Sequence, residues 1–338
     1  MKQKYLKWIS FTVLLLLLLI ISALFSLTTG EFSITLKDIF RLLSEKEGMD
    51  YFILSELRIP RVILGFAVGG GLSLAGVILQ GIFRNPLVEP YTLGVSGGAA
   101  VGVAFVIIFG LNITLGTLIL PIAGFGGAIL ALIVVGSLGF LRGGVDINKM
   151  LLIGVMISFV ASSTLMLLMS ISTKDNLQSI VFWMMGSLEE SKRLLINTVL
   201  ISSLIGLASS YFFARPLNAL LLGEAKAGHL GVDSKITIRV LFLIASLLTG
   251  ICVAVAGVIG FVGLVIPHFI RLIVGSDHRF LLIGSFLGGG IFLILSDIVA
   301  RTIIAPNELP IGVITGIAGG ILFIAVLHQN KRRASYGK

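Results

Sequence analysis

The sequence predicts an all-α polytopic membrane protein with about ten transmembrane helices. Of its 338 residues, 57% are hydrophobic and only 12% are charged, about half the charged fraction of a typical soluble domain. The mean hydropathy is +1.10. The apolar residues are gathered in runs of roughly twenty, the length that an α-helix needs to cross the hydrocarbon core of a bilayer. In lipid, such helices satisfy all of their backbone hydrogen bonds internally.

Ten apolar runs are candidate spans, and we expect them to form one transmembrane domain over residues 1–338. The first follows Lys2, Lys4 and Lys7 and contains six consecutive leucines. No small-x-small cleavage site follows it, so we expect it to be retained as a span and not removed as a signal peptide. The expected spans are 8–27, 62–83, 92–110, 113–140, 149–171, 193–213, 237–256, 258–275, 281–303 and 309–327.

The second span, residues 62–83, is unusually rich in glycine. It contains six glycines, including the triplet at positions 69–71. In water such a helix is disfavoured by about 1 kcal/mol for each glycine relative to alanine, whereas in lipid glycine lets neighbouring helices approach closely. We therefore expect a packed interior span. Pro86 and Pro90 follow it, and two prolines so close together predict a tight polar hairpin before the next span.

The distribution of charge predicts the orientation. With the N-terminus in the cytoplasm, ten spans return the C-terminus to the cytoplasm. The inside segments then contain 16 of the 25 Lys and Arg residues and 5 of the 16 acidic residues, against 9 and 10 outside. This excess follows the positive-inside rule. The net charge of +9 is thereby explained by topology, so the expected surroundings are membrane lipid and no nucleic acid.

Three polar segments are not spans. Residues 28–57 are expected to form an external amphipathic segment, and residues 175–190 a short external helix. Residues 214–236 form the longest cytoplasmic connection, in which leucines alternate with charged residues and with Gly223, Gly228 and Gly231. This pattern predicts two short amphipathic helices with glycine joints. They either lie in the lipid interface or insert into a groove of a partner protein.

An internal repeat is faintly visible. The sequence Ala-Gly-Val-Ile at 75–78 recurs at 256–259, and Pro86 and Pro267 share this offset. The sequence Ile-Gly-Val at 153–155 recurs at 311–313. Spans 2–5 and 7–10 would then form two four-helix halves. Because span 2 runs inward and span 7 runs outward, the halves would have inverted topology, which is a common design of transporters.

Several kinds of chemistry are missing from the sequence. It contains no G-x-x-x-x-G-K-[ST] loop to hold nucleotide phosphates, so this chain is not expected to be the ATPase. No Ser/His/Asp constellation stands out either, so we expect no enzyme, with an intramembrane hydrolase as the alternative. The four histidines are scattered and Cys252 is the single cysteine, so neither a metal site nor a cofactor is expected. The competing class is an ion-coupled secondary transporter. That class would need ionisable side chains facing a cavity within the membrane.

The charged residues of greatest interest are an acid and three arginines. Asp297 lies in the ninth span, and Arg301 lies four residues later on the same helix face, so the two are expected to form an intramembrane ion pair. Arg301 also reaches the external side, where Arg58 and Arg61 lie. Three outward arginines would suit an acidic partner, since guanidinium binds carboxylates in a bidentate manner. The alternative is interfacial anchoring of the span ends.

Long motifs in a fixed order resemble one known family. The sequence R-x-P-R at 58–61 is followed by A-G-x-x-L-Q-G-x-x-R-N-P-L-x-E-P-x-x-L-G-V-S-x-G-A. Further motifs are GFVGLVIPHFIRL (260–272), DHR (277–279), SDIVAR (296–301) and ELPIGVITG (308–316). Together they resemble the FecCD-type permeases of ABC importers for iron-siderophores and vitamin B12. The resemblance covers residues 30–327.

The resemblance implies a function and a set of partners. The chain would be the permease subunit that moves an iron-siderophore inward by ATP-driven alternating access, with a corrinoid or haem as the alternative cargo. It would lie in the cell membrane with both termini cytoplasmic. Its implied partners are two cytoplasmic ABC ATPase subunits, an external substrate-binding protein, and a second copy or a paralogue of the permease.

The resemblance also implies roles for individual residues. Arg58, Arg61 and Arg301 would form salt bridges with the substrate-binding protein. Ile147 and Asn148, in the loop before the fifth span, would belong to a cytoplasmic gate. The segment between the sixth and seventh spans would couple to the ATPase through Leu217, Leu220, Leu221, Gly223, Glu224, Ala227, Leu230 and Gly231.

Overall fold

The computed structural model describes residues 2–30, 34–140, 147–190 and 192–335. Every regular element within these ranges is a helix, so the predicted all-α class is confirmed. Seven of the described helices are long and apolar enough to cross a membrane, and three shorter apolar helices accompany them. These ten are α1 (Lys2–Thr28), α4 (Ile59–Phe83), α5 (Val95–Ile108), α7 (Ile119–Gly139), α8 (Ile147–Ser170), α10 (Arg193–Phe212), α13 (Ser234–Ala256), α14 (Val262–Val274), α15 (His278–Thr302) and α16 (Ile311–Ser335).

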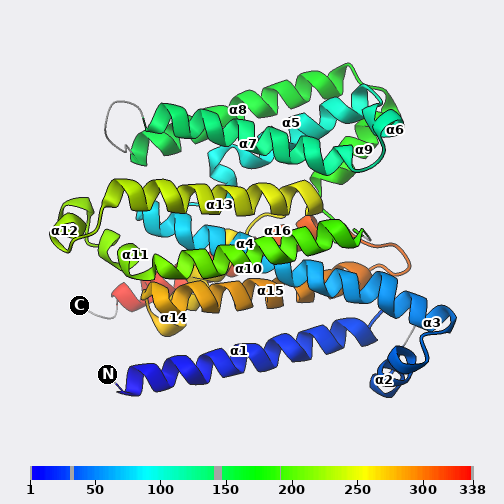
Figure 1. The fold of residues 1–338 in the computed structure, drawn as a ribbon, viewed down its shortest axis with the longest axis horizontal. Coiled ribbons are helices and arrows are strands. Elements are labelled where there is room, and N and C mark those ends of the chain that lie inside the picture. Colours follow the sequence, from blue (N-terminus) through cyan, green and yellow to red (C-terminus); the bar gives the residue numbers. More distant parts are fainter. Residues whose placement is uncertain (1, 31–33, 141–146, 191, 336–338) are drawn as a thin grey trace.

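The short helices lie at the two ends of this bundle (Figure 1). At one end, which we call the terminal end, α1 begins, α16 ends and the segment with α11 and α12 protrudes. The other end, which we call the opposite end, carries α2, α3, α6 and α9. The bounds of the short elements are α2 (Leu36–Glu45), α3 (Gly48–Phe52), a π-helical turn (Ile53–Arg58), a 3-10 turn (Pro90–Leu93), α6 (Leu111–Leu115), α9 (Lys174–Met184), α11 (Ala214–Leu220) and α12 (Glu224–His229).

Helix α4 is the centre of the bundle, as its glycine content predicts. Every residue from Ala67 to Phe83 is buried, and the helix packs against α10, α13, α14 and α15. The contact with α15 is so close that a Cβ atom on Gly69 would overlap the backbone of Gly289. Gly76 meets the backbone of Gly263 in the same way. These glycines therefore act in packing, because backbones that touch leave no room for a side chain.

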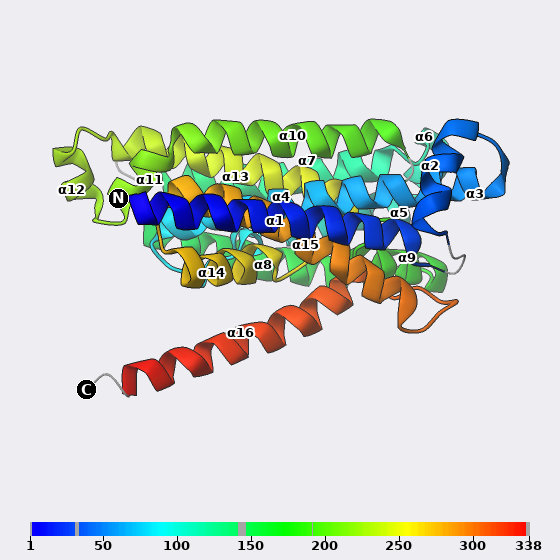
Figure 2. The same cartoon turned by 90° about the horizontal axis from the view of Figure 1, so that it is seen from below.

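The two expected halves run in opposite directions. Helix α4 runs toward the terminal end and α13 runs away from it, and α5, α7 and α8 are likewise antiparallel to α14, α15 and α16 (Figures 1 and 2). Helices α5 and α14 occupy corresponding positions in the two halves. Their 14 and 13 residues extend only about 20 Å at 1.5 Å per residue. Short, interrupted helices in matching positions are typical of transporters built from inverted repeats.

Three sequence expectations are corrected in detail. The expected span 113–140 is two helices, because Gly116 adopts φ 82° between α6 and α7. The expected span 258–275 begins as non-helical backbone, and α14 starts only at Val262. The repeated Ala-Gly-Val-Ile motif is helical at 75–78, whereas at 256–259 the helix ends at Ala256. The halves are thus related by helix order and direction, and this motif does not mark equivalent positions.

The non-helical segment before α14 is held by the hairpin that follows α4. The Tyr91 hydroxyl donates to the Ile259 carbonyl at 3.1 Å and accepts from the Ile259 amide at 3.2 Å. The Glu89 carboxylate accepts from the Phe261 amide at 3.0 Å. Burial raises the pKa of Glu89, and the Phe261 hydrogen bond opposes the increase. The hairpin therefore supplies the hydrogen bonds that a helix would otherwise make and joins the two halves.

Candidate functional site

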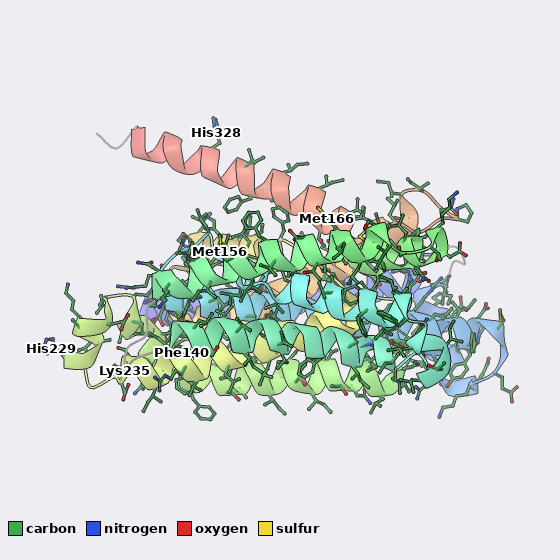
Figure 3. The ribbon with its side chains drawn as sticks, turned by 90° about the horizontal axis from the view of Figure 1, so that it is seen from above. Phe140, Met156, Met166, His229, Lys235 and His328 are labelled. Atoms are coloured by element: carbon green, nitrogen blue, oxygen red, sulfur yellow. The ribbon has the colours of Figure 1, made fainter. Side chains whose placement is uncertain are left out.

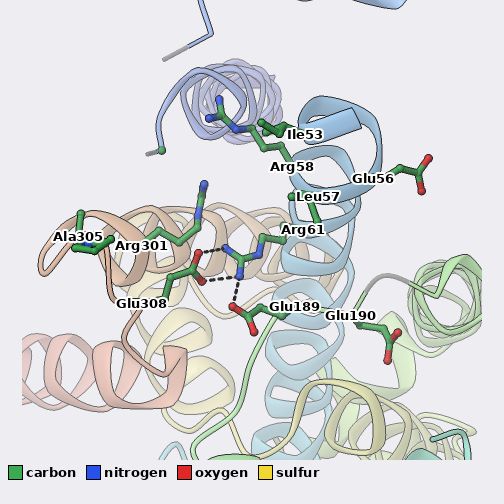
Figure 4. Close-up of a pocket in the computed structure, with 12 residues that line it drawn as sticks. Ile53, Glu56, Leu57, Arg58, Arg61, Glu189, Glu190, Arg301, Ala305 and Glu308 are labelled. Atoms are coloured by element: carbon green, nitrogen blue, oxygen red, sulfur yellow. Dashed lines mark hydrogen bonds and ion pairs between the residues drawn. The ribbon is translucent and has the colours of Figure 1, made fainter. Parts of the chain in front are cut away.

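A cavity of about 440 Å³ opens at the opposite end of the bundle. It is lined by Gly30 just after α1, by the π-helical turn and the start of α4, by the connection between α9 and α10, and by the end of α15 with the connection that follows it (Figure 4). All three arginines that the sequence analysis selected line this cavity, together with four glutamates. The charged lining residues are Arg58, Arg61, Arg301, Glu56, Glu189, Glu190 and Glu308.

Arg61 is bound by two carboxylates from distant parts of the chain (Figure 4). Its Nη1 and Nη2 atoms donate to Glu308 at 3.0 and 2.6 Å, and Nη2 also donates to Glu189 at 2.7 Å. The Arg61 side chain is 12% exposed, whereas those of Glu189 and Glu308 are 60% and 41% exposed. The bidentate pair with Glu308 is the strong form of this interaction. One cation therefore holds two acidic loops at this surface.

The two carboxylates differ in their affinity for protons. Burial raises the pKa of Glu189, and its hydrogen bond with Glu308 raises it further. For Glu308, burial is outweighed by hydrogen bonds from Arg61 and Glu189, which lower its pKa. A proton added to this cluster would accordingly bind to Glu189, and Glu308 would keep its charge beside Arg61. Neither glutamate was selected from the sequence, since only the fold brings them to Arg61.

The expectation of three outward arginines is corrected for Arg58 and Arg301. Arg58 is 5% exposed and its Nη1 donates to the Leu27 carbonyl at 2.6 Å. Arg301 donates to the Thr29 carbonyl at 3.1 Å and to the Ser26 hydroxyl at 2.9 Å. Helices leave their last carbonyls without partners, and cations stabilise that end. Both arginines therefore cap the C-terminal end of α1 from the cavity wall.

The predicted ion pair within the membrane is present. Arg301 Nε donates to Asp297 Oδ2 at 2.9 Å, and the two side chains are 7% and 8% exposed. Asp297 thus has a dedicated cationic partner on its own helix. Asp297 also lines a cavity of about 330 Å³ with Arg61 and Glu308. Its ion pair with Arg301 nevertheless fits a structural role, whereas an ion-coupled transporter needs an unpaired carboxylate that is open to a path.

At the terminal end, α11 and α12 form the two short helices predicted for residues 214–236. Gly223 and Gly231 adopt φ 98° and 80° at the joints, where other residues would be strained. Of the eight residues selected here, three are buried within the chain and cannot touch a partner directly, namely Leu217, Leu220 and Ala227. Leu221 and Leu230 are 42% and 63% exposed. Gly223 and Glu224 are half-buried, and Gly231 is exposed.

A polar cluster fixes α11 to the start of α15. Asn218 Nδ2 donates to Asp277 Oδ1 at 2.8 Å, and Asn218 Oδ1 accepts from the His278 amide at 2.9 Å. Asp277 caps α15 and also meets Lys4 Nζ at 3.4 Å. Hydrogen bonds from Asn218 and Lys4 outweigh burial and lower the pKa of Asp277. Movement of α11 would therefore be transmitted directly to α15, one of the helices packed on the central α4.

The expected gate residues lie in the first turn of α8. Ile147 is buried and Asn148 is exposed. Most of the loop before them, residues 141–146, lies outside the described residues. The role of Ile147 and Asn148 in a gate remains a proposal.

Comparison with known families decides what kind of protein carries these features. The sequence profile of the FecCD transport family matches residues 17–329. The chain belongs to the FecCD transport family. As a FecCD protein it is an integral membrane protein and the permease component of an ABC importer, which confirms the family expected from its motifs.

Relatives of this FecCD permease carry several cargoes. It is 37% identical to the hemin transport permease of Yersinia pestis, with 95% of this chain and 96% of the relative covered. It is 34% identical to the vitamin B12 import permease of Shigella boydii, with 98% of both covered. For the molybdate import permease of Haemophilus influenzae the identity is 38%, with 94% and 95% covered.

A solved structure shares the fold of this FecCD permease. It is an inward-facing ABC transporter described as being of the metal-chelate type. The TM-score is 0.82 at 33% sequence identity, and 95% of this chain and 99% of the other are covered. The ten-helix arrangement described above is thus that of an ABC permease.

Proposed function

We propose that this FecCD permease imports an iron-siderophore, with haem or a corrinoid as the alternative cargo. The observation that carries the proposal is the similarity in fold, over nearly the whole chain, to a transporter described as being of the metal-chelate type. A ferric siderophore, haem and a corrinoid are all chelated metals. The relatives named for hemin, vitamin B12 and molybdate have similar identities to this chain, so overall identity does not choose among cargoes.

Uptake by the reconstituted importer tests this proposal. We expect proteoliposomes that contain the permease, its ATPase and its binding protein to accumulate a ferric siderophore in the presence of ATP. Cobalamin, haem and molybdate serve as competing cargoes in the same assay. Selective uptake of molybdate would contradict the chelate proposal while leaving the importer class intact. Uphill uptake by the permease alone, driven by an ion gradient, would contradict the importer mechanism itself.

We place the ATPase at the terminal end and the binding protein at the opposite end. The terminal end carries α11 and α12, whose exposed Leu221, Leu222 and Leu230 form an apolar projection suited to a groove. It also carries most of the basic clusters, which fits a cytoplasmic side. Two ATPase subunits closing on ATP would then push α11 and, through Asn218 and Asp277, move α15. Ligands would shift the permease between outward and inward states by binding one of them more tightly.

A second permease copy, or a paralogue, is proposed to pack against α8 and α16. Helix α16 leaves the bundle at an angle (Figure 2), and Met156 and Met166 of α8 lie on the side from which it departs (Figure 3). Both helices present large exposed apolar side chains, such as Met166 at 70% and Ile321 at 65%. A partner that packs between α8 and α16 would enclose a path. The proposed gate residues Ile147 and Asn148 would lie near the terminal end of this path.

Charge reversal at Arg61 is expected to weaken docking of the binding protein at least tenfold. In Arg61→Glu, a third carboxylate would join Glu189 and Glu308 opposite an acidic partner, and like charges at an interface are strongly unfavourable. Arg61 is chosen because Arg58 and Arg301 cap the end of α1. Charge reversal at either of these two would disturb the fold, and an effect on docking could not be separated from it. The affinity of the purified binding protein for the permease–ATPase complex in nanodiscs measures the effect.

Two further variants separate this docking role from a general effect of charge. Arg41→Glu changes an exposed arginine of α2 at the same end and should leave the affinity unchanged. Glu308→Gln removes the bidentate carboxylate of Arg61 and leaves only Glu189 on Nη2, so the less neutralised guanidinium should bind the partner a few times more tightly. An unaltered affinity in Arg61→Glu would refute the docking assignment.

A further inference from the structure

A crevice of about 330 Å³ lies between α1, α10 and α15 near the terminal end. Both α1 and α10 pack on α15, and the crevice follows them on the side of the bundle that would face lipid. It is apart from the arginine–glutamate cluster at the opposite end and from α12. Its lining residues are Tyr5, Trp8, Ile9, Thr12, Val13, Tyr211, Arg279, Phe280 and Ile283.

Arg279 is the only charged residue in this lining, and its interactions are incomplete. Its Nε atom is buried and has no hydrogen-bond partner among the described residues. A buried guanidinium nitrogen without an acceptor is costly. The neighbouring Asp277 does not fill this need, since its carboxylate accepts from Asn218, from Lys4 and from the Arg279 backbone amide. Among the described residues no carboxylate forms an ion pair with Arg279, so an anionic ligand in the crevice would supply the counter-charge that its guanidinium lacks.

The lining changes from polar to apolar along the helices. Tyr5, Trp8, Tyr211 and Arg279 lie at the ends of their helices, and Lys4 places its ammonium 4.7 Å from the centre of the Trp8 ring. Val13 and Ile283 lie one or more turns deeper. Aromatic and basic side chains belong at the level of lipid headgroups, and apolar ones belong beside acyl chains. This order of side chains is that of a phospholipid aligned with the bundle.

We infer that this crevice binds one phospholipid with an anionic headgroup, in the leaflet on the side of both termini. The phosphate group accepts from Arg279, with Lys4 as a second cation beside it, and one acyl chain packs along Ile9, Val13 and Ile283. Basic pockets between transmembrane helices are known to select anionic headgroups. The bound lipid would fill the space between α1 and α10 where both pack on α15. Helix α15 is also the helix that is joined to α11.

Native mass spectrometry of the intact permease tests this site. Detergent-solubilised protein is mixed with phosphatidylglycerol or with phosphatidylcholine, and the retained lipid is measured. We expect phosphatidylglycerol to be retained preferentially and Arg279→Gln to reduce its retention about fivefold, the loss expected for one basic contact. Arg279→Lys, which keeps the charge, should retain most of it. Arg215→Gln removes an exposed arginine of α11 at the same end and should have no effect.

Four results would overturn the inference. Equal retention of both lipids would exclude headgroup recognition, and an equal loss in Arg215→Gln would indicate a diffuse effect of charge. Displacement of the lipid by millimolar inorganic phosphate would show that the site recognises a free anion and does not select a lipid. Thr12→Phe fills the crevice without changing its charge and should also reduce retention, so the site is testable even if Arg279→Gln does not yield folded protein. Unchanged retention in Thr12→Phe would place the lipid elsewhere.

Discussion

Asp297→Ala is expected to destabilise the folded permease by about 3 kcal/mol, the lower end of the range for breaking a buried ion pair. The substitution leaves the guanidinium of Arg301, whose side chain is 7% exposed, without its counter-charge. The effect lies at the lower end because Arg301 keeps acceptors at Thr29 and Ser26. Unfolding by sodium dodecyl sulfate in mixed micelles, followed by circular dichroism, measures the difference in free energy.

Two variants test whether the loss comes from the unpaired charge. In Asp297→Ala with Arg301→Met, neither charge of the pair remains, so stability should recover by about 1 kcal/mol or more, as it does when buried pairs are replaced by apolar side chains. Asp297→Asn keeps an acceptor for Arg301 and should lose less than the alanine variant. If the double variant were no more stable than Asp297→Ala, the pair would not be the source of the effect.

The ten helices could be predicted because lipid leaves the backbone few choices. An apolar run of sufficient length must be helical, and the glycines of α4 indicated its central position before any contact was known. The non-helical backbone before α14 could not be predicted in this way. Its amides and carbonyls are satisfied by Glu89 and Tyr91, which lie about 170 residues earlier, and hydropathy carries no information about such distant partners.

The arginines of the charged site could be selected from the sequence, whereas their contacts could be predicted only in part. The spacing of Asp297 and Arg301 was sufficient for their ion pair, because positions four apart share a helix face. The capping contacts of Arg58 and Arg301 depend on where the end of α1 lies, and their positions in the sequence do not specify it. Glu308 was missed as a partner of Arg61 because 247 residues separate them. The motif ELPIGVITG contains Glu308 and was the available signal.

Replacing Leu221 and Leu230 with aspartate together is expected to abolish ATP-dependent uptake while leaving the permease folded. Both side chains are exposed, so the change costs the fold little. Burying a leucine in a partner groove contributes about 1.5–3 kcal/mol, so two losses should weaken ATPase binding at least about tenfold. Co-purification of the ATPase and cargo uptake measure the two effects. Leu217→Ala is the matched contrast, since Leu217 is 0% exposed and its truncation should cost about 2–5 kcal/mol of stability.

A further variant of the same segment distinguishes whether α12 is surrounded by a groove of the ATPase or by lipid. Aspartate would disturb either surroundings, whereas tryptophan is favoured in the interfacial region of a membrane. Leu230→Trp should therefore be tolerated if α12 lies in lipid and should impair ATPase binding if Leu230 fills a pocket of leucine size. The joints at Gly223 and Gly231 hold α12 away from the bundle, beyond the buried Leu217 and Leu220. This position favours insertion of α12 into a pocket of the ATPase over a position in the lipid interface. Normal ATPase binding and uptake in Leu230→Trp would remove α12 from the coupling interface.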